Sequence, residues 1–188
     1  GDQVRFVLTW GDGASGASEE LDSHLVGPAA SGTGEFHIYF SDQTYTAGED
    51  GNIRYADLDV DDTDYEGPET TTIYVKTAGN YRFYVYDYSN EGVGTNLRKS
   101  SAVVKAYIGS KLMATYNCPQ EDGGLWDVCD YNSSTNKFVT KNIVSDFEEG
   151  SGSVGVDMVK LYQNRLNEAI KNAENIIAVN PELAEKLR

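Results

Sequence analysis

Positive charge is scarce in this sequence of 188 residues, which has 15 Lys and Arg residues against 30 Asp and Glu residues. The formal net charge is therefore −15 at pH 7. Nucleic acid and anionic membrane surfaces repel such a chain, so the composition argues against both as partners. Long apolar runs are also missing, and none approaches the roughly 20 residues of a membrane-spanning helix. The sequence predicts no nucleic-acid partner and no membrane span.

The motifs of several enzyme classes are absent as well. There is no G-x-S-x-G turn to present a nucleophilic serine, and neither cysteine stands beside a recognisable histidine partner. The segment Gly11-Asp12-Gly13 lacks the sequel and the lysine of a phosphate-binding loop. These absences predict a non-catalytic protein.

Cysteine is rare, with only Cys118 and Cys129 in the chain. A bridge between them would suit a secreted protein. They flank a turn-like segment, PQEDGG. In a regular hairpin around it, Cys118 would face a residue near Leu125, a few positions short of Cys129. A disulfide and two buried thiols both stay open.

The residues that are plentiful favour β structure, with 13 Tyr and 19 Gly residues beside many Thr and Val residues. Alternating apolar and polar residues predict short strands, among them 4–10, 20–26 and 35–40. Two hairpins are expected, turning at Ala78-Gly79 and at Gly109-Ser110, and residues 41–52 are expected to form a polar loop. With roughly nine or ten strands and no helix among them, the fold class is all-β, an antiparallel β-sandwich of Ig-like or jelly-roll topology.

The character of the chain changes after about residue 145. We expect a β-sandwich domain over 1–146 and a linker over 147–155, where Gly, Ser and Glu prevail. A C-terminal amphipathic α-helix is expected over 156–188, because apolar residues recur there at spacings of three or four. This helix is expected to pack on the sandwich or to lead into another domain of a longer protein, whose targeting segments lie outside this sequence. Self-association or partner binding is the alternative.

The acidic stretch 55–69, YADLDVDDTDYEGPE, is the first candidate site. Its second half copies the beginning of a D-x-D-x-D-G calcium loop, but the twelfth position is Ile73 and not the bidentate Glu of a complete loop. The predicted calcium ligands are Asp62, Asp64, Glu66 and Glu69. The alternative is a solvated acidic turn that protects an edge strand.

The two histidines form the second candidate site. His24 and His37 lie on the polar faces of predicted strands, and Asp22 projects from the same face as His24. Asp57 and Asp59 would join them if their strand is a neighbour. Two imidazoles with carboxylates suit Zn²⁺ or another transition metal, and an open fourth position would permit hydrolysis. The alternative is a pair of histidines hydrogen-bonded to neighbouring Asp residues.

A row of aromatic side chains is the third candidate site. Tyr84, Tyr86 and Tyr88 alternate along one strand face together with Arg82. Flat aromatic rows can stack on sugar rings, which predicts a carbohydrate-binding surface. The alternative is a second packed face of the sheet.

Several motifs in order carry a resemblance to a known family: VLTWG, LDSHLVGP, FHIYF, YADLDVDDT, GPETTTI and NYRFYVYDYS, then SSAVVKAYIGSKL and GLWDVC. Over residues 4–144 the chain resembles the bacterial YfaP-like domain of unknown function. This resemblance implies a β-sandwich module of exported or surface proteins without an assigned activity.

Together these features predict a non-catalytic, calcium-stabilised module of a bacterial cell-surface or secreted protein, used for adhesion, spacing or ligand binding. A carbohydrate-binding module and a metal-dependent hydrolase using His24 and His37 are the alternatives. The expected location is extracellular, at the cell surface or in the periplasm. The expected partners are other domains of a larger surface protein, a glycan, or a host or partner protein.

Overall fold

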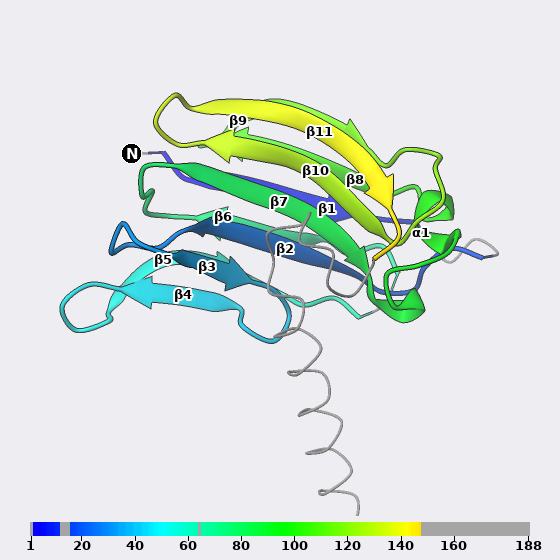
Figure 1. Cartoon of the computed structure of the whole chain (residues 1–188), viewed down its shortest axis with the longest axis horizontal. Coiled ribbons are helices and arrows are strands. Elements are labelled where there is room, and N and C mark those ends of the chain that lie inside the picture. Colours follow the sequence, from blue (N-terminus) through cyan, green and yellow to red (C-terminus); the bar gives the residue numbers. More distant parts are fainter. Residues whose placement is uncertain (1, 12–15, 64, 148–188) are drawn as a thin grey trace, which may run out of the picture. The chain divides into compact units, whose positions relative to one another are not determined.

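Two antiparallel β-sheets make up the part of the chain that the computed structural model describes, which is residues 2–11, 16–63 and 65–147 (Figure 1). The six-stranded sheet runs in the order β4 (Thr44–Ala47), β5 (Ile53–Leu58), β6 (Glu69–Ile73), β1 (Val4–Thr9), β8 (Val103–Ile108) and β9 (Lys111–Asn117). The five-stranded sheet runs in the order β11 (Lys137–Ser145), β10 (Leu125–Asn132), β7 (Asn80–Asp87), β2 (Leu21–Pro28) and β3 (Glu35–Ile38). A 3-10 turn, η1 (Tyr88–Asn90), and a one-turn helix, α1 (Asn96–Lys99), lie between β7 and β8.

The core lies between the two sheets, as the alternation of apolar residues requires. In β1, Val4, Phe6 and Leu8 are completely buried, while the residues between them face outward. Phe6 stacks on Phe83 of β7 with ring centroids 4.5 Å apart, so this pair joins the middle of one sheet to the middle of the other. The predicted antiparallel sandwich is confirmed.

Strand pairing confirms one predicted hairpin and corrects the other. β8 pairs with β9 around Gly109-Ser110, with Ile108 opposite Lys111. The hairpin predicted at Ala78-Gly79 is wrong, because β6 pairs with β1 and β5 whereas β7 pairs with β2 and β10. The chain crosses there from one sheet to the other. Both strands keep a period of two, and this period does not identify the partner of a strand.

Two further expectations need correction. The segment 41–52, expected to be a loop, contains the edge strand β4, whose alternate residues are only half-buried and so give a weak hydrophobic pattern. The Ig-like topology is also wrong, because the described residues form sheets of six and five strands, more than the seven or nine of Ig domains.

The predicted linker and C-terminal helix fall almost entirely on residues 148–188, which lie outside the described residues. Cys118 and Cys129 are both buried free thiols, so the disulfide alternative is not realised. Among the described residues, no helix is long and apolar enough to cross a membrane.

Candidate functional site

Strand β2 is buried on both of its faces, and one of these faces carries buried polar side chains. Leu21 and Leu25 point into the core between the sheets. Asp22 and His24 alternate with them and therefore lie on the outer face, yet both are 0% exposed. Burial of a carboxyl group and an imidazole on one strand is uncommon, because polar groups lose their hydration there. Two groups of side chains gather around these residues.

The first group is an acidic cluster formed by Glu20, Asp22 and Asp61. One carboxylate oxygen from each residue lies within 4.8 Å of the others. Glu20 directly precedes β2 and Asp22 is its second residue, whereas Asp61 comes from the connection between β5 and β6. Asp22 is buried, and Glu20 and Asp61 are half-buried. Two distant segments thus bring three carboxylates to one point.

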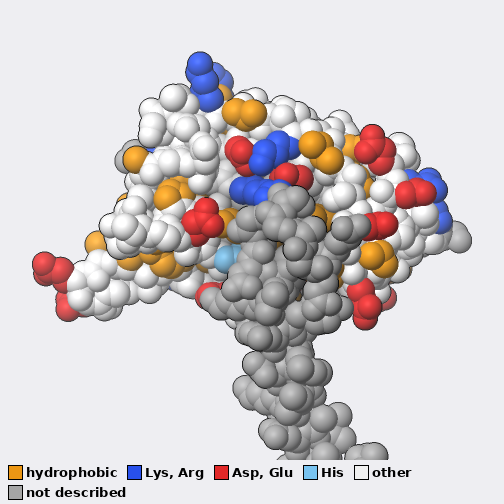
Figure 2. All heavy atoms as spheres, viewed as in Figure 1, with side chains coloured by type: hydrophobic (Ala, Val, Ile, Leu, Met, Phe, Trp, Pro, Cys, Tyr) orange, Lys and Arg blue, Asp and Glu red, His pale blue; other side chains and the backbone are white. Residues whose placement is uncertain are grey.

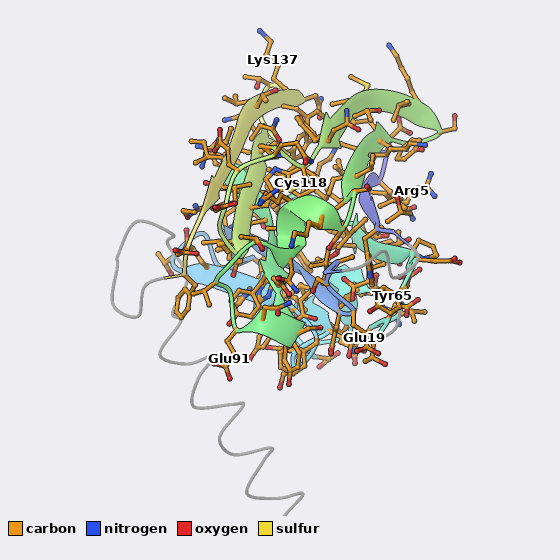
Figure 3. All side chains as sticks on the ribbon, turned by 90° about the vertical axis from the view of Figure 1, so that its right-hand side faces the viewer. Arg5, Glu19, Tyr65, Glu91, Cys118 and Lys137 are labelled. Carbon is orange, nitrogen blue, oxygen red and sulfur yellow. The ribbon has the colours of Figure 1, made fainter. Side chains whose placement is uncertain are left out.

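Trp10 holds these two segments side by side. Its indole N–H donates to the carbonyl oxygen of Glu19 at 3.1 Å, and its backbone N–H donates to the carbonyl oxygen of Glu66 at 3.5 Å. Figure 3 shows Glu19 and Tyr65 in the same lower part of that view. Because Trp10 is itself buried and lies just beyond the central strand β1, the framework around the acidic cluster is anchored in the core.

Glu69 supports the acidic cluster from the inside of the sandwich. It is completely buried, and its carboxyl group accepts hydrogen bonds from the N–H of Ser23 at 2.8 Å and the N–H of Asp62 at 3.3 Å. Burial raises its pKa to about 8, with a smaller contribution in the same direction from Asp61. Since Glu69 begins β6 and Ser23 belongs to β2, this hydrogen bond crosses from one sheet to the other.

The other predicted calcium ligands are spread along the same connection. Asp62 is half-buried, and Glu66 is exposed with a left-handed backbone, φ 89°. Asp64 lies outside the described residues. Their role as ligands stays a prediction. Asp61 was missed because the calcium-loop pattern begins one residue later, and Glu20 was missed because nothing in the sequence relates it to the acidic stretch.

The second group contains both histidines, which the structure brings together as predicted. Nδ1 of His24 lies 2.9 Å from Nε2 of His37. The hydroxyl of Tyr84, which sequence reasoning did not place here, lies 3.0 Å from the first nitrogen and 3.2 Å from the second.

The two carboxylates predicted to join the histidines lie elsewhere. Asp57 belongs to β5 in the other sheet, where it pairs with Arg54 at 2.9 Å and accepts a hydrogen bond from Tyr74 at 3.3 Å. Asp59 is exposed and accepts a hydrogen bond from the N–H of Thr70 at 2.9 Å. The structure therefore keeps Asp22 on the face of His24 but separates Asp57 and Asp59 from it.

The predicted sugar-binding row is wrong. Tyr84 and Tyr86 are 0% and 1% exposed, so no flat aromatic surface is open to a sugar ring. Tyr88 is half-buried in η1, and Arg82 pairs with Asp127 at 2.6 Å. The alternation found the correct strand face, but that face is covered.

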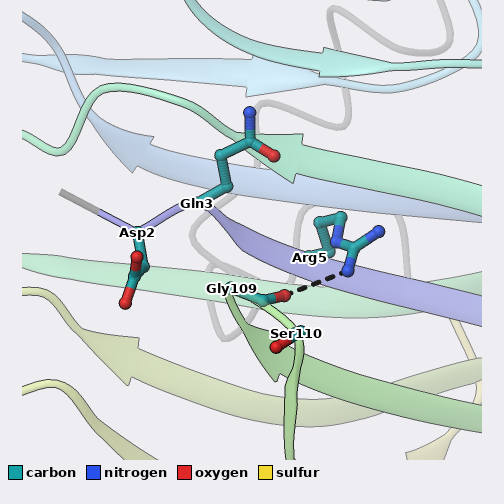
Figure 4. Close-up of a pocket in the computed structure, with 5 residues that line it drawn as sticks. All are labelled: Asp2, Gln3, Arg5, Gly109 and Ser110. Atoms are coloured by element: carbon teal, nitrogen blue, oxygen red, sulfur yellow. Dashed lines mark hydrogen bonds between the residues drawn. The ribbon is translucent and has the colours of Figure 1, made fainter.

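A separate hollow of about 410 Å³ lies at the start of β1 beside the turn between β8 and β9 (Figure 4). Its lining includes Asp2, Gln3 and Arg5. Arg5 donates a hydrogen bond to the carbonyl oxygen of Gly109 at 3.0 Å and lies over the ring of Tyr107. The guanidinium group is thus already used to hold the turn, and the hollow brings together no set of reactive groups.

The fold and the acidic cluster define an antiparallel β-sandwich with a candidate cation site, and comparison with known proteins bears on the fold. No family model and no curated protein matches this sequence. A crystal structure of a protein of unknown function, SAV2460, matches with a TM-score of 0.55 and 13% identity over 84% of this chain and 96% of that chain. A homologue of the telluride resistance protein TerD, SCO6318 from Streptomyces coelicolor A3(2), matches with a TM-score of 0.56 and 14% identity over the same shares.

These structures overturn two predictions. The fold is similar to that of a TerD homologue, so the resemblance to the YfaP-like surface domain is wrong, and the cell-surface adhesion function drawn from it is wrong as well. Neither neighbour supports the carbohydrate-binding or hydrolase alternatives. The motifs behind the resemblance consist of alternating strand residues and turn residues, which many antiparallel sandwiches share.

Proposed function

We propose that this domain binds a hard divalent cation, with Ca²⁺ as the ion that suits its ligands best, through Glu20, Asp22 and Asp61. The observation that carries the proposal is the meeting of three carboxylate oxygens from two segments within 4.8 Å. Ca²⁺ takes about six to eight oxygen ligands and tolerates irregular geometry, so backbone carbonyls and water can complete the shell. An all-oxygen set favours Ca²⁺ over softer transition metals.

The energetics of the acidic cluster support a bound cation. Two carboxylate oxygens at most 4.8 Å apart repel each other by at least about 3 kcal/mol at the effective dielectric of a protein surface. Asp22 adds a desolvation cost, because its side chain is completely buried. A divalent ion between the three carboxylates replaces their mutual repulsion by attraction to the ion. This attraction also offsets the desolvation cost of Asp22.

The position of the acidic cluster indicates what the ion does for the protein. Glu20 and Asp61 lie in segments that are far apart in sequence and are held together by Trp10 and Glu69. A cation adds a third link between the start of β2 and the connection from β5 to β6. Binding should therefore stabilise the sandwich and order this end of it.

Thermal unfolding with EDTA and with added Ca²⁺ tests the proposal on three proteins: wild type, Asp61→Asn and Asp50→Asn. Asp61 is only half-buried, so its amide variant should fold. Asp50 is an exposed residue of the β4–β5 turn, and its variant makes the same charge change away from the acidic cluster. At 100 times the Kd, an ion that binds only the folded state adds about 2.7 kcal/mol.

We expect Ca²⁺ to raise the Tm of the wild type and of Asp50→Asn, and to leave Asp61→Asn nearly unchanged. In EDTA, Asp61→Asn should be at least as stable as the wild type, because one of the repelling charges is gone. An equal Ca²⁺ response in all three proteins, or none in the wild type, would contradict the assignment.

A further inference from the structure

A second candidate site lies on the outer face of the five-stranded sheet, where β7, β2 and β3 are neighbours. His24 on β2 is directly opposite Tyr84 on β7. His37 on β3 is opposite Val26, two residues along β2 from His24, and is therefore its diagonal neighbour. The adjacent residues Leu25, Ile38 and Phe83 belong to the core, which places these three polar side chains together on the other face.

The three polar atoms form a compact triangle. Nδ1 of His24, Nε2 of His37 and Oη of Tyr84 are separated by 2.9, 3.0 and 3.2 Å. The centre of such a triangle is about 1.8 Å from each corner, so an ion about 1 Å out of its plane lies about 2.0 Å from all three atoms, the usual zinc–nitrogen distance. The spacing suits three ligands on one side of a four-coordinate metal ion.

Hydrogen bonding alone satisfies this triangle less well. When both imidazoles are neutral, the three close contacts share two protons: one on the phenol and one on an imidazole nitrogen. At least one of the three contacts therefore has no hydrogen bond of its own, unless one proton is shared between two acceptors. A metal ion takes the lone pairs of all three atoms at once.

Packing holds the three donors in place. The ring of His24 stacks on Tyr84 with centroids 4.6 Å apart, and Tyr39 stacks on His37 at 4.4 Å and on His24 at 5.6 Å. Rings fixed in this way lose little freedom when a ligand binds, which favours affinity. His24 is buried but His37 is half-buried, and histidine atoms are visible at the surface in Figure 2, so an ion can reach the site from solvent.

The charged groups around the triangle are mixed in sign. Asp22 lies on the same face two residues before His24, and both it and Asp127 act electrostatically on Tyr84. Arg82 lies over the Tyr84 ring, 5.8 Å from its centroid, and pairs with Asp127. Burial raises the pKa of Tyr84 well above its ordinary value, and the charge of Arg82 opposes this only in part. A bound metal ion must therefore displace the phenol proton, and the charge of Asp22 attracts such an ion.

We propose that His24, His37 and Tyr84 together bind one transition-metal ion of the Zn²⁺ class, with water as a fourth ligand. Imidazole and phenolate suit Zn²⁺, Cu²⁺ and Ni²⁺ better than Ca²⁺, so this site is separate in chemistry from the acidic cluster. On binding, both nitrogens donate lone pairs, and the phenol proton passes to the buffer. No catalytic step is part of the proposal, which does not depend on Ca²⁺ binding at the acidic cluster.

Calorimetric titration with Zn²⁺ in saturating Ca²⁺ tests the site, because Ca²⁺ then occupies any all-oxygen site. The proteins are wild type, His37→Gln, Tyr84→Phe and the matched control Tyr81→Phe. Tyr81 lies on the same strand, and its hydroxyl contacts the backbone of Thr77 and not the histidines. We expect one Zn²⁺ per chain in the wild type and in Tyr81→Phe, and at least about tenfold weaker binding in the other two.

A titration with Cu²⁺ gives an independent readout of the phenolate ligand. The visible absorption band of a tyrosinate–copper bond should appear in the wild type and in Tyr81→Phe, and should be missing in Tyr84→Phe. Melting curves in EDTA establish that each variant is folded. The proposal is overturned if wild type binds no Zn²⁺, or if folded His37→Gln or Tyr84→Phe binds it as tightly as wild type does.

Discussion

Glu69 is a carboxyl group completely buried between two sheets, and its titration should govern how stability depends on pH. Burial raises its pKa from 4.5 to about 8 in the folded protein. Between these values the unfolded chain releases a proton that the folded protein keeps, so stability falls as the pH rises from about 4.5 to about 8. The loss is at most about 5 kcal/mol, at about 1.4 kcal/mol per pKa unit.

Denaturant unfolding of wild type and Glu69→Gln between pH 4.5 and 8, in EDTA, measures this effect. The amide does not ionise, and its single acceptor oxygen can keep the shorter of the two hydrogen bonds, the one from the N–H of Ser23. We expect the stability of the wild type, relative to the variant, to decline by a few kcal/mol across this range. A constant difference between the two proteins would show that Glu69 titrates alike in the folded and unfolded states.

Residue patterns located only part of each candidate site. His24 and His37 were found because they are the only histidines and both alternate with apolar neighbours, which fixes their face. Tyr84 was assigned to the correct face but was expected at the surface. Alternation says which residues share a face, and it does not say whether other side chains cover that face, as Tyr39 does here.

At the scale of the elements, local turns were predictable and long-range pairing was not. Gly109-Ser110 specifies a tight turn by its own chemistry, and β8 and β9 pair around it. The neighbours of β2, which are β3 and β7, follow from the packing of the whole sandwich. The separation of Asp57 from the histidines and the approach of Asp61 to Asp22 both depend on that packing, so the sequence pattern could not supply them.

One close backbone contact between connecting segments should also be visible in mutants. A Cβ atom on Gly124 would lie 2.0 Å from the carbonyl carbon of Gly92, so one of the two segments must move. We expect Gly124→Ala to lower the free energy of unfolding by about 3 kcal/mol.

Gly51→Ala is the matched control for this prediction. Gly51 has a left-handed φ of 64° but nothing within 4 Å of its added Cβ, so alanine there should cost only about 1 kcal/mol. Denaturant unfolding of both variants measures the difference. If Gly124→Ala is no less stable than Gly51→Ala, the segments of Gly92 and Gly124 are not packed as closely as described.

For the whole molecule, composition and periodicity predicted the all-β class and the antiparallel sandwich, and both are confirmed. Composition and periodicity did not predict the order of the strands in the two sheets. Structures with 13% and 14% identity share its fold, so sequences that differ at most positions form this sandwich. The central claim is that the acidic end of this sandwich is a cation site.

A crystal structure of the protein grown with Ca²⁺ tests that claim most directly. The account predicts one ion in contact with carboxylate oxygens of Glu20, Asp22 and Asp61, at about 2.3 to 2.6 Å. The claim is contradicted if no ion lies between these three side chains, or if Ca²⁺ binds elsewhere in the acidic connection and leaves them apart.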